Sequence, residues 1–268
     1  MAKAKTPDMS SKKYPKMGWI PDLPDARDFI YSAPLKVMKS IPAKVDLKKY
    51  CPPVYDQGDL GSCTANALGA AFEFGKKKQK KKTFRPSRLF LYYNERVLMN
   101  TVNSDSGAYL RLGIKSLNKQ GICPEKDWTY DDSTAPGAKF MQKPPAGCYK
   151  TALDHQILSY WRVPISIMSI KSCLAEGYPI SFGFTVYESF FKPSVAKNGI
   201  MPMPDVTKEE VVGGHAVLAV GYDDKTQRVL VRNSWGKSWG LAGYFWMPYS
   251  YIADDNYCDD FWTIRNVE

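Results

Sequence analysis

The chain has 268 residues, of which 44% are hydrophobic and 13% aromatic, as in an ordinary globular protein that is long enough to bury a core. No stretch approaches the ~20 consecutive apolar residues of a membrane-spanning helix, and residues 1–16 lack the apolar segment of a secretion signal. The formal net charge of +10 leaves a nucleic acid or another anionic surface open as a partner. The cellular location stays open between the cytoplasm, processing from a longer chain and release by another route.

Residues 1–40 are expected to form a short leader. Prolines at positions 15, 21, 24 and 34 argue against a long helix in it. Two interpretations are open, and the sequence favours neither. The leader could be an inhibitory or docking arm that lies over the functional site and is removed or displaced on activation. It could instead be a structural strap that packs Trp19, Ile20 and Phe29 against the body of the protein.

Cys63 lies where a turn-forming stretch gives way to an expected helix. Apolar residues then recur with helical spacing, and Gly75 is a plausible stop: Ala67, Ala70, Ala71 and Phe74. A thiol at a helix N-terminus feels the positive end of the helix dipole and loses its proton more easily. Taken alone, however, Cys63 could equally be a buried helical cysteine without chemistry.

Six of the seven residues from Lys76 to Lys82 are lysines. Such a run can bind nucleic acid or an anionic surface. It can also be a solvated loop whose cations are favoured beyond the C-terminal end of a helix. No aromatic residue alternates with these lysines, as a platform for stacked bases would require, and we therefore prefer the second interpretation.

Two further helices are predicted in the first half of the chain. One runs from near Pro86 to Met99, and the other runs from Leu110 to Gln120 and ends at Gly121. Residues 129–149 are rich in proline, glycine and polar side chains and predict a loop. This half of the protein is therefore expected to be helical.

From Ile157 the pattern changes to that of a β-rich region. A short helix is expected near residues 169–176, followed by a strand over residues 179–186. We therefore predict an α+β protein with a helical lobe at 41–155 and a β-rich lobe at 156–268. A cleft between two lobes is a favoured place for a ligand site.

Two apolar strands joined by the short polar stretch 223–227 predict a hairpin. If Tyr222 pairs with Thr226, His215 lies opposite Asn233 on the same face of the hairpin. A base would then have an orienting amide beside it, although a bulge would break this register.

Few other residues are candidates for catalysis or for metal binding. His155 is the chain's other histidine and has no comparable neighbourhood. The spacing of the cysteines matches no zinc pattern, so neither a metal nor a cofactor is expected: they stand at positions 51, 63, 123, 148, 173 and 258. With Cys63 as a free nucleophile, at least one more cysteine must be unpaired.

Four blocks in chain order resemble the papain-like cysteine peptidases. They are Ile41–Asp46, which is similar to the mature N-terminus of that family, Gln57 six residues before Cys63, Gly214–Val217 around His215, and Asn233–Gly240, continued by Gly243 and Tyr244. The resemblance implies the papain-like two-lobe fold, with a helical left lobe, a β-barrel-like right lobe and an active-site cleft between them. It also implies a monomeric endopeptidase that acts on polypeptides, made as a zymogen if the leader inhibits it.

The resemblance assigns roles to individual residues. Cys63 would be the nucleophile, His215 its acid–base partner, Asn233 the residue that aligns His215, and Gln57 a donor to the oxyanion. Trp235 would shield the contact between His215 and Asn233 from water.

The same family pattern implies a substrate-binding cleft. Gly107 would contact the substrate through its backbone, and Gly214 takes the place of an acidic or amide residue in many relatives. Small side chains at Gly213 and Ala216 would lie near the pocket for the P2 residue and admit a large apolar side chain there.

The sequence departs from the family pattern at two positions near the nucleophile. Thr64 replaces the tryptophan that follows the nucleophile in many relatives. Leu60 replaces a cysteine that usually forms a disulfide, which fits a reducing compartment. Two other functions stay open: an acyltransferase or transglutaminase-type enzyme in which an amine replaces water, and a non-catalytic protein that binds through Lys76–Lys82.

Overall fold

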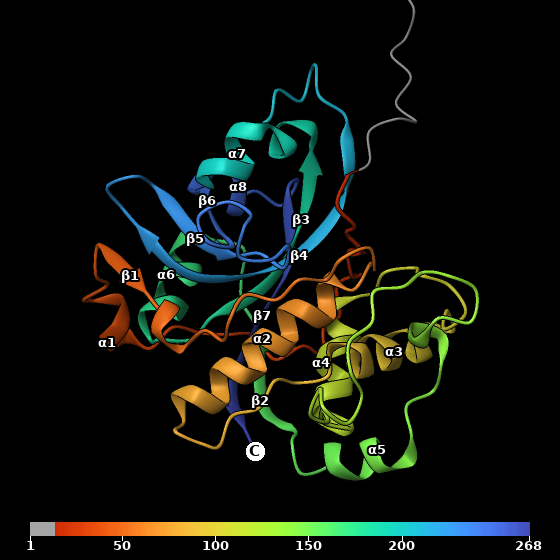
Figure 1. Ribbon diagram of the computed structural model, residues 1–268. Coiled ribbons are helices and arrows are strands. Elements are labelled where there is room, and N and C mark those ends of the chain that lie inside the picture. The colour runs from red at the N-terminus through yellow and green to blue at the C-terminus, as the bar shows by residue number, and fades with distance from the viewer. Residues whose placement is uncertain (1–13) are drawn as a thin grey trace, which may run out of the picture.

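The computed structural model describes residues 14–268 (Figure 1). The predicted helical lobe at 41–155 contains α2 (Cys63–Lys78), α3 (Arg88–Met99), α4 (Leu110–Lys119) and α5 (Ala146–Ala152), with the short helices η2 (Lys48–Tyr50) and η3 (Lys139–Met141). The other helices lie outside it: α1 (Leu35–Met38), α6 (Ile167–Ala175), η4 (Glu188–Phe191), α7 (Pro193–Asn198) and α8 (Tyr249–Ile252).

The strands form one antiparallel sheet. Their bounds are β1 (Lys44–Asp46), β2 (Ile157–Arg162), β3 (Ile180–Tyr187), β4 (Val211–Asp223), β5 (Arg228–Arg232), β6 (Tyr244–Pro248) and β7 (Cys258–Val267). The order is β2-β7-β3-β4-β5-β6, and β1 pairs with the far end of β4. The right lobe was expected to be barrel-like, but β2 and β6 are the edges of an open sheet. β1 belongs by sequence to the helical half and nevertheless joins this sheet.

Helix α2 is the contact between the two halves of the protein. It packs against β4 and β7 on the sheet and against α3 and α4 among the helices, and most of its residues are buried (Figure 1). Small residues permit this close packing, because a Cβ at Gly75 would lie 3.0 Å from the Val267 side chain. The contact accounts for a glycine at position 75, which was expected to end the helix; α2 instead continues to Lys78.

Other local predictions need smaller corrections. The predicted loop at 129–149 contains η3 and the start of α5. Helix α3 begins two residues after Pro86, because the Ser87 hydroxyl accepts a hydrogen bond from the backbone N–H of Phe90 and caps the helix at that point.

None of the six cysteines forms a disulfide. Within residues 14–268, no helix has the length and apolar character needed to cross a bilayer.

The expected register of the hairpin is wrong. Tyr222 pairs with Val229 and not with Thr226, and the ladder between β4 and β5 shifts between Ala219 and Gly221. The register differs already at the turn, because Asp223 pairs with Arg228 and the loop between the strands is residues 224–227. The irregularity between Ala219 and Gly221 then shifts the ladder once more on the way to the site.

Candidate active site

Cys63 is the first residue of α2 and is fully buried. Its Sγ accepts a hydrogen bond from the backbone N–H of Ala216 in β4 at 3.3 Å. The nucleophile proposed from the sequence therefore lies against the strand that carries His215, although 153 residues separate Cys63 from Ala216.

His215 is held by the residues that follow β5. Its Nε2 lies 2.8 Å from Oδ1 of Asn233, and its ring stacks on Trp235 with centroids 4.8 Å apart. The contact forms in spite of the shifted register, because Asn233 lies one residue beyond the end of β5. The Nδ1 atom of His215 makes no hydrogen bond to any residue between 14 and 268, so Cys63 and His215 share no direct hydrogen bond.

Burial decides the protonation of this pair. It raises the pKa of the Cys63 thiol to about 12, against the weaker opposing effect of the Ala216 N–H. Burial also lowers the pKa of His215 to about 4, and the hydrogen bond to Asn233 acts weakly in the other direction. Burial thus shifts both groups toward their neutral forms in this closed arrangement.

Gln57 is buried beside the nucleophile, and both ends of its amide are used. Oε1 accepts a hydrogen bond from the Ser234 hydroxyl at 2.6 Å, which orients the amide. Nε2 donates to the carbonyl oxygens of Leu60 at 3.0 Å and of Lys16 at 3.1 Å. A carbonyl of the leader thus lies at the donor that the family resemblance assigns to the oxyanion.

The leader crosses the region between the two halves as an extended strand. Gly18 and Trp19 each donate their backbone N–H to the carbonyl oxygen of Gly214, at 3.1 and 3.0 Å. On the other side, Ala108 N–H donates to Gly18 at 2.7 Å, and Ile20 N–H donates to Ala108 at 3.1 Å. The leader therefore uses the backbone groups that a bound peptide would need.

Gly107 explains why the leader can approach so closely. A Cβ there would lie 2.1 Å from the carbonyl oxygen of Gly18, and the residue has a φ of +73° that favours glycine. Gly107 was expected to contact the substrate through its backbone, and in this structure its neighbour is the leader backbone at Gly18.

The Trp19 side chain is buried at a place where two glycines allow it to approach the backbone closely. A Cβ at Gly183 would lie 1.9 Å from the indole, and a Cβ at Gly214 would lie 2.4 Å from the Trp19 carbonyl oxygen. The indole Nε1 donates to Oδ2 of Asp260 at 2.9 Å. Gly213, which was expected near the pocket for the P2 residue, faces the side chain of Met17.

Sequence reasoning missed Asp260 and Gly183. Asp260 contacts a residue 241 positions away and lies in a strand with no recognisable motif. The available signal was a glycine within a strand, because Gly183 interrupts an apolar run and such a glycine often marks a close approach.

Charged residues anchor the leader beyond Trp19. The guanidinium of Arg111 pairs with Asp22 and Asp28 of the leader. Arg162 lies 3.4 Å from Asp28, 2.7 Å from Asp259 and 3.2 Å from Asp260. These side chains are mostly buried, so the ion pairs are screened by solvent much less than surface pairs.

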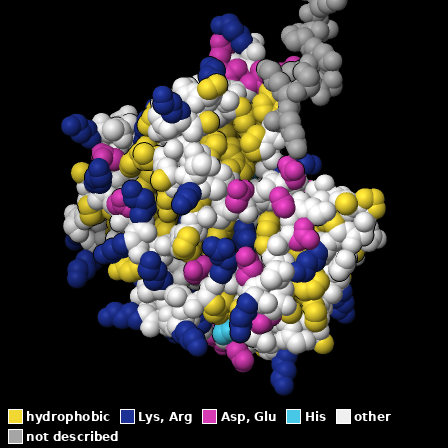
Figure 2. Space-filling view, in the orientation of Figure 1, with side chains coloured by type: hydrophobic (Ala, Val, Ile, Leu, Met, Phe, Trp, Pro, Cys, Tyr) yellow, Lys and Arg dark blue, Asp and Glu magenta, His cyan; other side chains and the backbone are white. Residues whose placement is uncertain are grey.

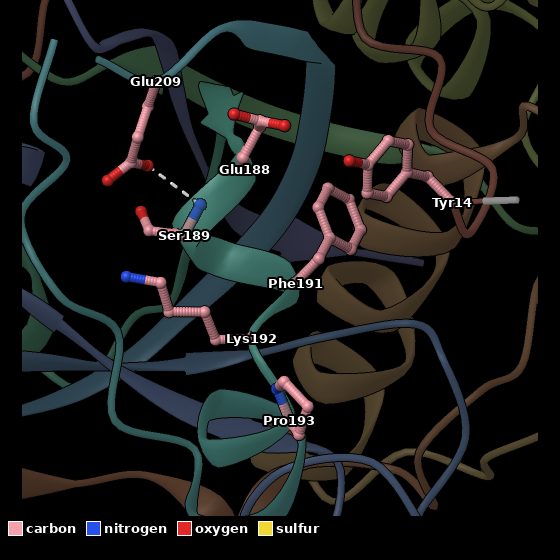
Figure 3. Close-up of a pocket in the computed structure, with 7 residues that line it drawn as sticks. All are labelled: Tyr14, Glu188, Ser189, Phe191, Lys192, Pro193 and Glu209. Carbon is pink, nitrogen blue, oxygen red and sulfur yellow. Dashed lines mark hydrogen bonds between the residues drawn. The ribbon is translucent and has the colours of Figure 1, made fainter. Parts of the chain in front are cut away.

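Tyr14, two residues before Lys16 in the leader, lines another hollow, which has a volume of about 420 Å³ (Figure 3). The ring of Tyr14 lies 4.4 Å from that of Phe191, which stacks on Trp235. The carboxylates of Glu188 and Glu209 line the same hollow, and Glu209 accepts from the backbone N–H of Ser189 at 2.9 Å.

The lysine run lies at the other end of α2, away from this site. Three of its side chains donate to carbonyl oxygens: Lys76 to Glu268, Lys78 to Gly177 and Lys81 to Val267. Part of the run thus fixes α2 to the last strand. Figure 2 shows Lys and Arg side chains spread around one face of the molecule and mixed with Asp and Glu, without a single large basic surface on that face.

Residues 41–259 match the family model described as papain family cysteine protease. An uncharacterized peptidase C1-like protein of Acanthamoeba polyphaga mimivirus is 42% identical over 93% of this chain and 86% of its own length. A gut-specific cysteine proteinase of Caenorhabditis elegans is 33% identical, over 75% of this chain and 55% of its own length.

Solved structures agree with these sequence relatives. The structure of Xylellain, a cysteine protease from Xylella fastidiosa, superimposes with a TM-score of 0.89 and 47% identity, over 96% of this chain and 99% of that one. Procathepsin B of Trypanosoma congolense superimposes with a TM-score of 0.75 at 16% identity, over 94% and 86% of the two chains, and supports the fold alone.

Proposed function

This chain belongs to the papain family of cysteine proteases and is a cysteine-type peptidase, and we propose that its leader holds it in a closed, inactive state. The observation that carries the proposal is the position of Lys16, whose carbonyl oxygen occupies the amide donor of Gln57. While the leader holds that donor and the carbonyl of Gly214, a substrate cannot use either group.

In the open enzyme, Cys63 and His215 act as an acid–base pair. Water that enters the cleft lowers the cost of charging both groups, and the thiol proton moves to Nδ1 of His215. The thiolate attacks the peptide carbonyl, and the oxyanion accepts from Nε2 of Gln57 and the backbone N–H of Cys63. His215 then gives its proton to the leaving amine, and a water molecule hydrolyses the thioester with His215 as base.

Asn233 and Trp235 position the imidazole in this scheme. The 2.8 Å contact between Nε2 of His215 and Oδ1 of Asn233 requires a proton on Nε2, because the amide oxygen is only an acceptor. Nδ1 is then left free to accept the thiol proton. The stacked Trp235 ring restricts rotation of the imidazole and keeps water from its contact with Asn233.

The position of Trp19 supports a substrate preference. We propose that the pocket at Gly183, Gly214 and Asp260 accepts the side chain of the P2 residue. The pocket already holds an indole, so its size suits a large side chain. The carboxylate of Asp260 favours one that also carries an N–H donor, such as tryptophan or arginine.

Active-site labelling tests the closed state. A thiol-directed epoxide should label Cys63 slowly in the full chain, and much faster once limited proteolysis within residues 30–40 lets the leader leave, with peptidase activity appearing in parallel. Peptide mapping supplies an internal control, since the other five cysteines are also buried and should react only if the protein unfolds. Equal labelling and equal activity before and after cleavage would contradict inhibition by the leader, and absence of activity after Cys63 is labelled would still support the peptidase assignment.

A further inference from the structure

A cavity separate from those described above lies at the C-terminal end of α2. Its volume is about 500 Å³, within the range of small-molecule sites. Lys76, which lines it, is thirteen residues along the helix from Cys63, a separation of roughly 20 Å at the helical rise per residue. The cavity is therefore distinct from the peptidase cleft.

Cationic side chains dominate the lining of this cavity. Its wall carries Lys76, Lys82, Arg85, Lys126 and His155, together with Thr83, Phe84, Pro124 and Glu125. Glu125 is the acidic member, and Arg88 and Arg85 pair with it at 3.1 and 3.8 Å, so its charge is already balanced. Within residues 14–268, no carboxylate lies within ion-pair distance of Lys82.

The floor of the cavity is ordered. The rings of Phe84 and His155 lie 4.5 Å apart, and Nζ of Lys76 lies 5.4 Å from the centre of the Phe84 ring. Lys76 is buried and is held by the carbonyl oxygen of Glu268 at 2.7 Å. A lysine whose ammonium is fixed by Glu268 above an aromatic floor distinguishes this hollow from a set of mobile surface lysines.

The electrostatic effects of the neighbours agree with an excess of positive charge. Burial lowers the pKa of Lys76, and the nearby Lys81 lowers it further. Burial also lowers the pKa of His155, with Lys76 as the next cause, while Asp154 and Glu268 act more weakly in the opposite direction. An anion in the cavity would relieve these repulsions.

We propose that this cavity binds a compact phosphate anion with several negative charges. Arg85, whose contact with Glu125 is the longer of the two at 3.8 Å, offers a planar fork of donors for phosphate oxygens. Lys82 and Lys126 supply two further cations at the rim, where Lys126 lies 4.0 Å from Asp127. A concave site of this size suits a compact ligand better than an extended one. Nucleic acid binding would require a longer track of positive charge than this cavity provides.

Calorimetric titration with inorganic tripolyphosphate tests the proposal on the full chain. The double variant K82A/K126A should bind tripolyphosphate at least about tenfold more weakly than the original chain, because two charge-assisted contacts are lost. The matched control is K77A/K150A, which removes two exposed helical lysines outside the cavity and the same total charge. The control should retain the affinity of the original chain.

The imidazole of His155 supplies a second readout. In an NMR titration with pH, the pKa of His155 should rise when tripolyphosphate is bound and the His215 signal should not change. Equal weakening in both double variants would overturn the proposal and indicate unspecific attraction to net charge. Absence of both heat and a His155 shift at millimolar tripolyphosphate would also overturn it, as would tight binding of a single-stranded oligonucleotide that is equally tight in K82A/K126A.

Discussion

The amide Nε2 of Gln57 donates a hydrogen bond to the carbonyl oxygen of Lys16 at 3.1 Å. The acceptor is a main-chain carbonyl of the leader, and the donor is one that peptide hydrolysis would direct at the oxyanion. The closed state therefore uses the polar groups of the reaction site for binding its own chain. In the closed state that we propose, leader docking and substrate binding compete for the same atoms.

Removing the amide should slow the chemical step of the activated enzyme. We expect Q57A to lower kcat by a factor of about 100 to 1000, the effect of losing one oxyanion donor, with little change in KM. Steady-state kinetics after leader cleavage measure both constants. The control is Q142A, a change at an exposed glutamine distant from the site.

A change in KM without a fall in kcat would contradict this role for Gln57. An equal fall of kcat in Q142A would contradict it as well. Because the Gln57 amide also contacts Leu60 and Ser234, the thermal unfolding midpoint of each variant should be measured alongside the kinetics.

Trp19 should contribute most to leader docking. Truncation of a buried tryptophan costs about 3–5 kcal/mol, so W19A should raise the open fraction of the uncleaved protein by on the order of 100-fold or more. The measurement is the rate of Cys63 labelling before any cleavage. L23A is the matched control in the same leader, because the Leu23 side chain is largely exposed.

If the leader is only a structural strap, the result will differ. W19A would then lower the thermal unfolding midpoint without accelerating Cys63 labelling below the unfolding transition. L23A should change neither quantity.

Leader docking should depend on pH through Asp260. Burial raises the pKa of this carboxyl to about 7, and the neighbouring Asp22 adds to the effect. The docked state therefore holds the Asp260 proton more tightly than the open state, in which solvent returns the pKa toward about 4. Docking is strongest below the open-state pKa and weakens as the pH rises through about 7.

Asp260 faces Arg162 as well as Asp22 and Asp259, so the variant must isolate its own titration. D260N keeps an acceptor for the Trp19 indole and removes the ionisable group. The ratio of Cys63 labelling rates, original chain over D260N, should rise between about pH 4 and pH 7 and level off above that range. A ratio that is constant or falls with pH would show that Asp260 does not set the pH dependence.

Glu95 should make the folded protein less stable as the pH rises. The hydroxyl of Thr64 donates to its Oε2 at 2.8 Å, whereas Oε1 makes no hydrogen bond to any residue of 14–268. Burial raises the pKa of Glu95 to about 8, above the ordinary value of about 4.3 for an unfolded chain. Between these two values the folded state binds the extra proton, and stability falls with pH by at most about 1.4 kcal/mol per unit.

The variant E95Q keeps the acceptor for Thr64 and removes this titration. Its thermal unfolding midpoint, relative to that of the original chain, should rise steadily from pH 5 to pH 8. E210Q is the matched control, since Glu210 is half-buried at most and lies on a loop before β4. A midpoint difference that does not change with pH would show that Glu95 is not protonated in the fold.

Local sequence was sufficient to identify the helices that carry the site. Helix α4 follows from its periodicity with bounds close to those predicted, and the blocks around Cys63 and His215 identify the family before any coordinates. These features depend on interactions between neighbours in the chain, and such interactions are legible in short windows of sequence. The end of α2 was predicted wrongly. Gly75 was expected to stop the helix, but it lies inside the helix and approaches Val267 of the last strand, a contact that no short window of sequence shows.

The sequence by itself determined the family, the α+β class and the four residues we assign to chemistry. Only the tertiary structure decided that a leader carbonyl meets the Gln57 amide, that Asp260 and Gly183 contact Trp19, and that burial shifts Cys63 and His215 toward their neutral forms. The physical reason is that leader contacts and desolvation arise between segments up to 241 residues apart. No local pattern encodes which backbone groups such distant segments will share.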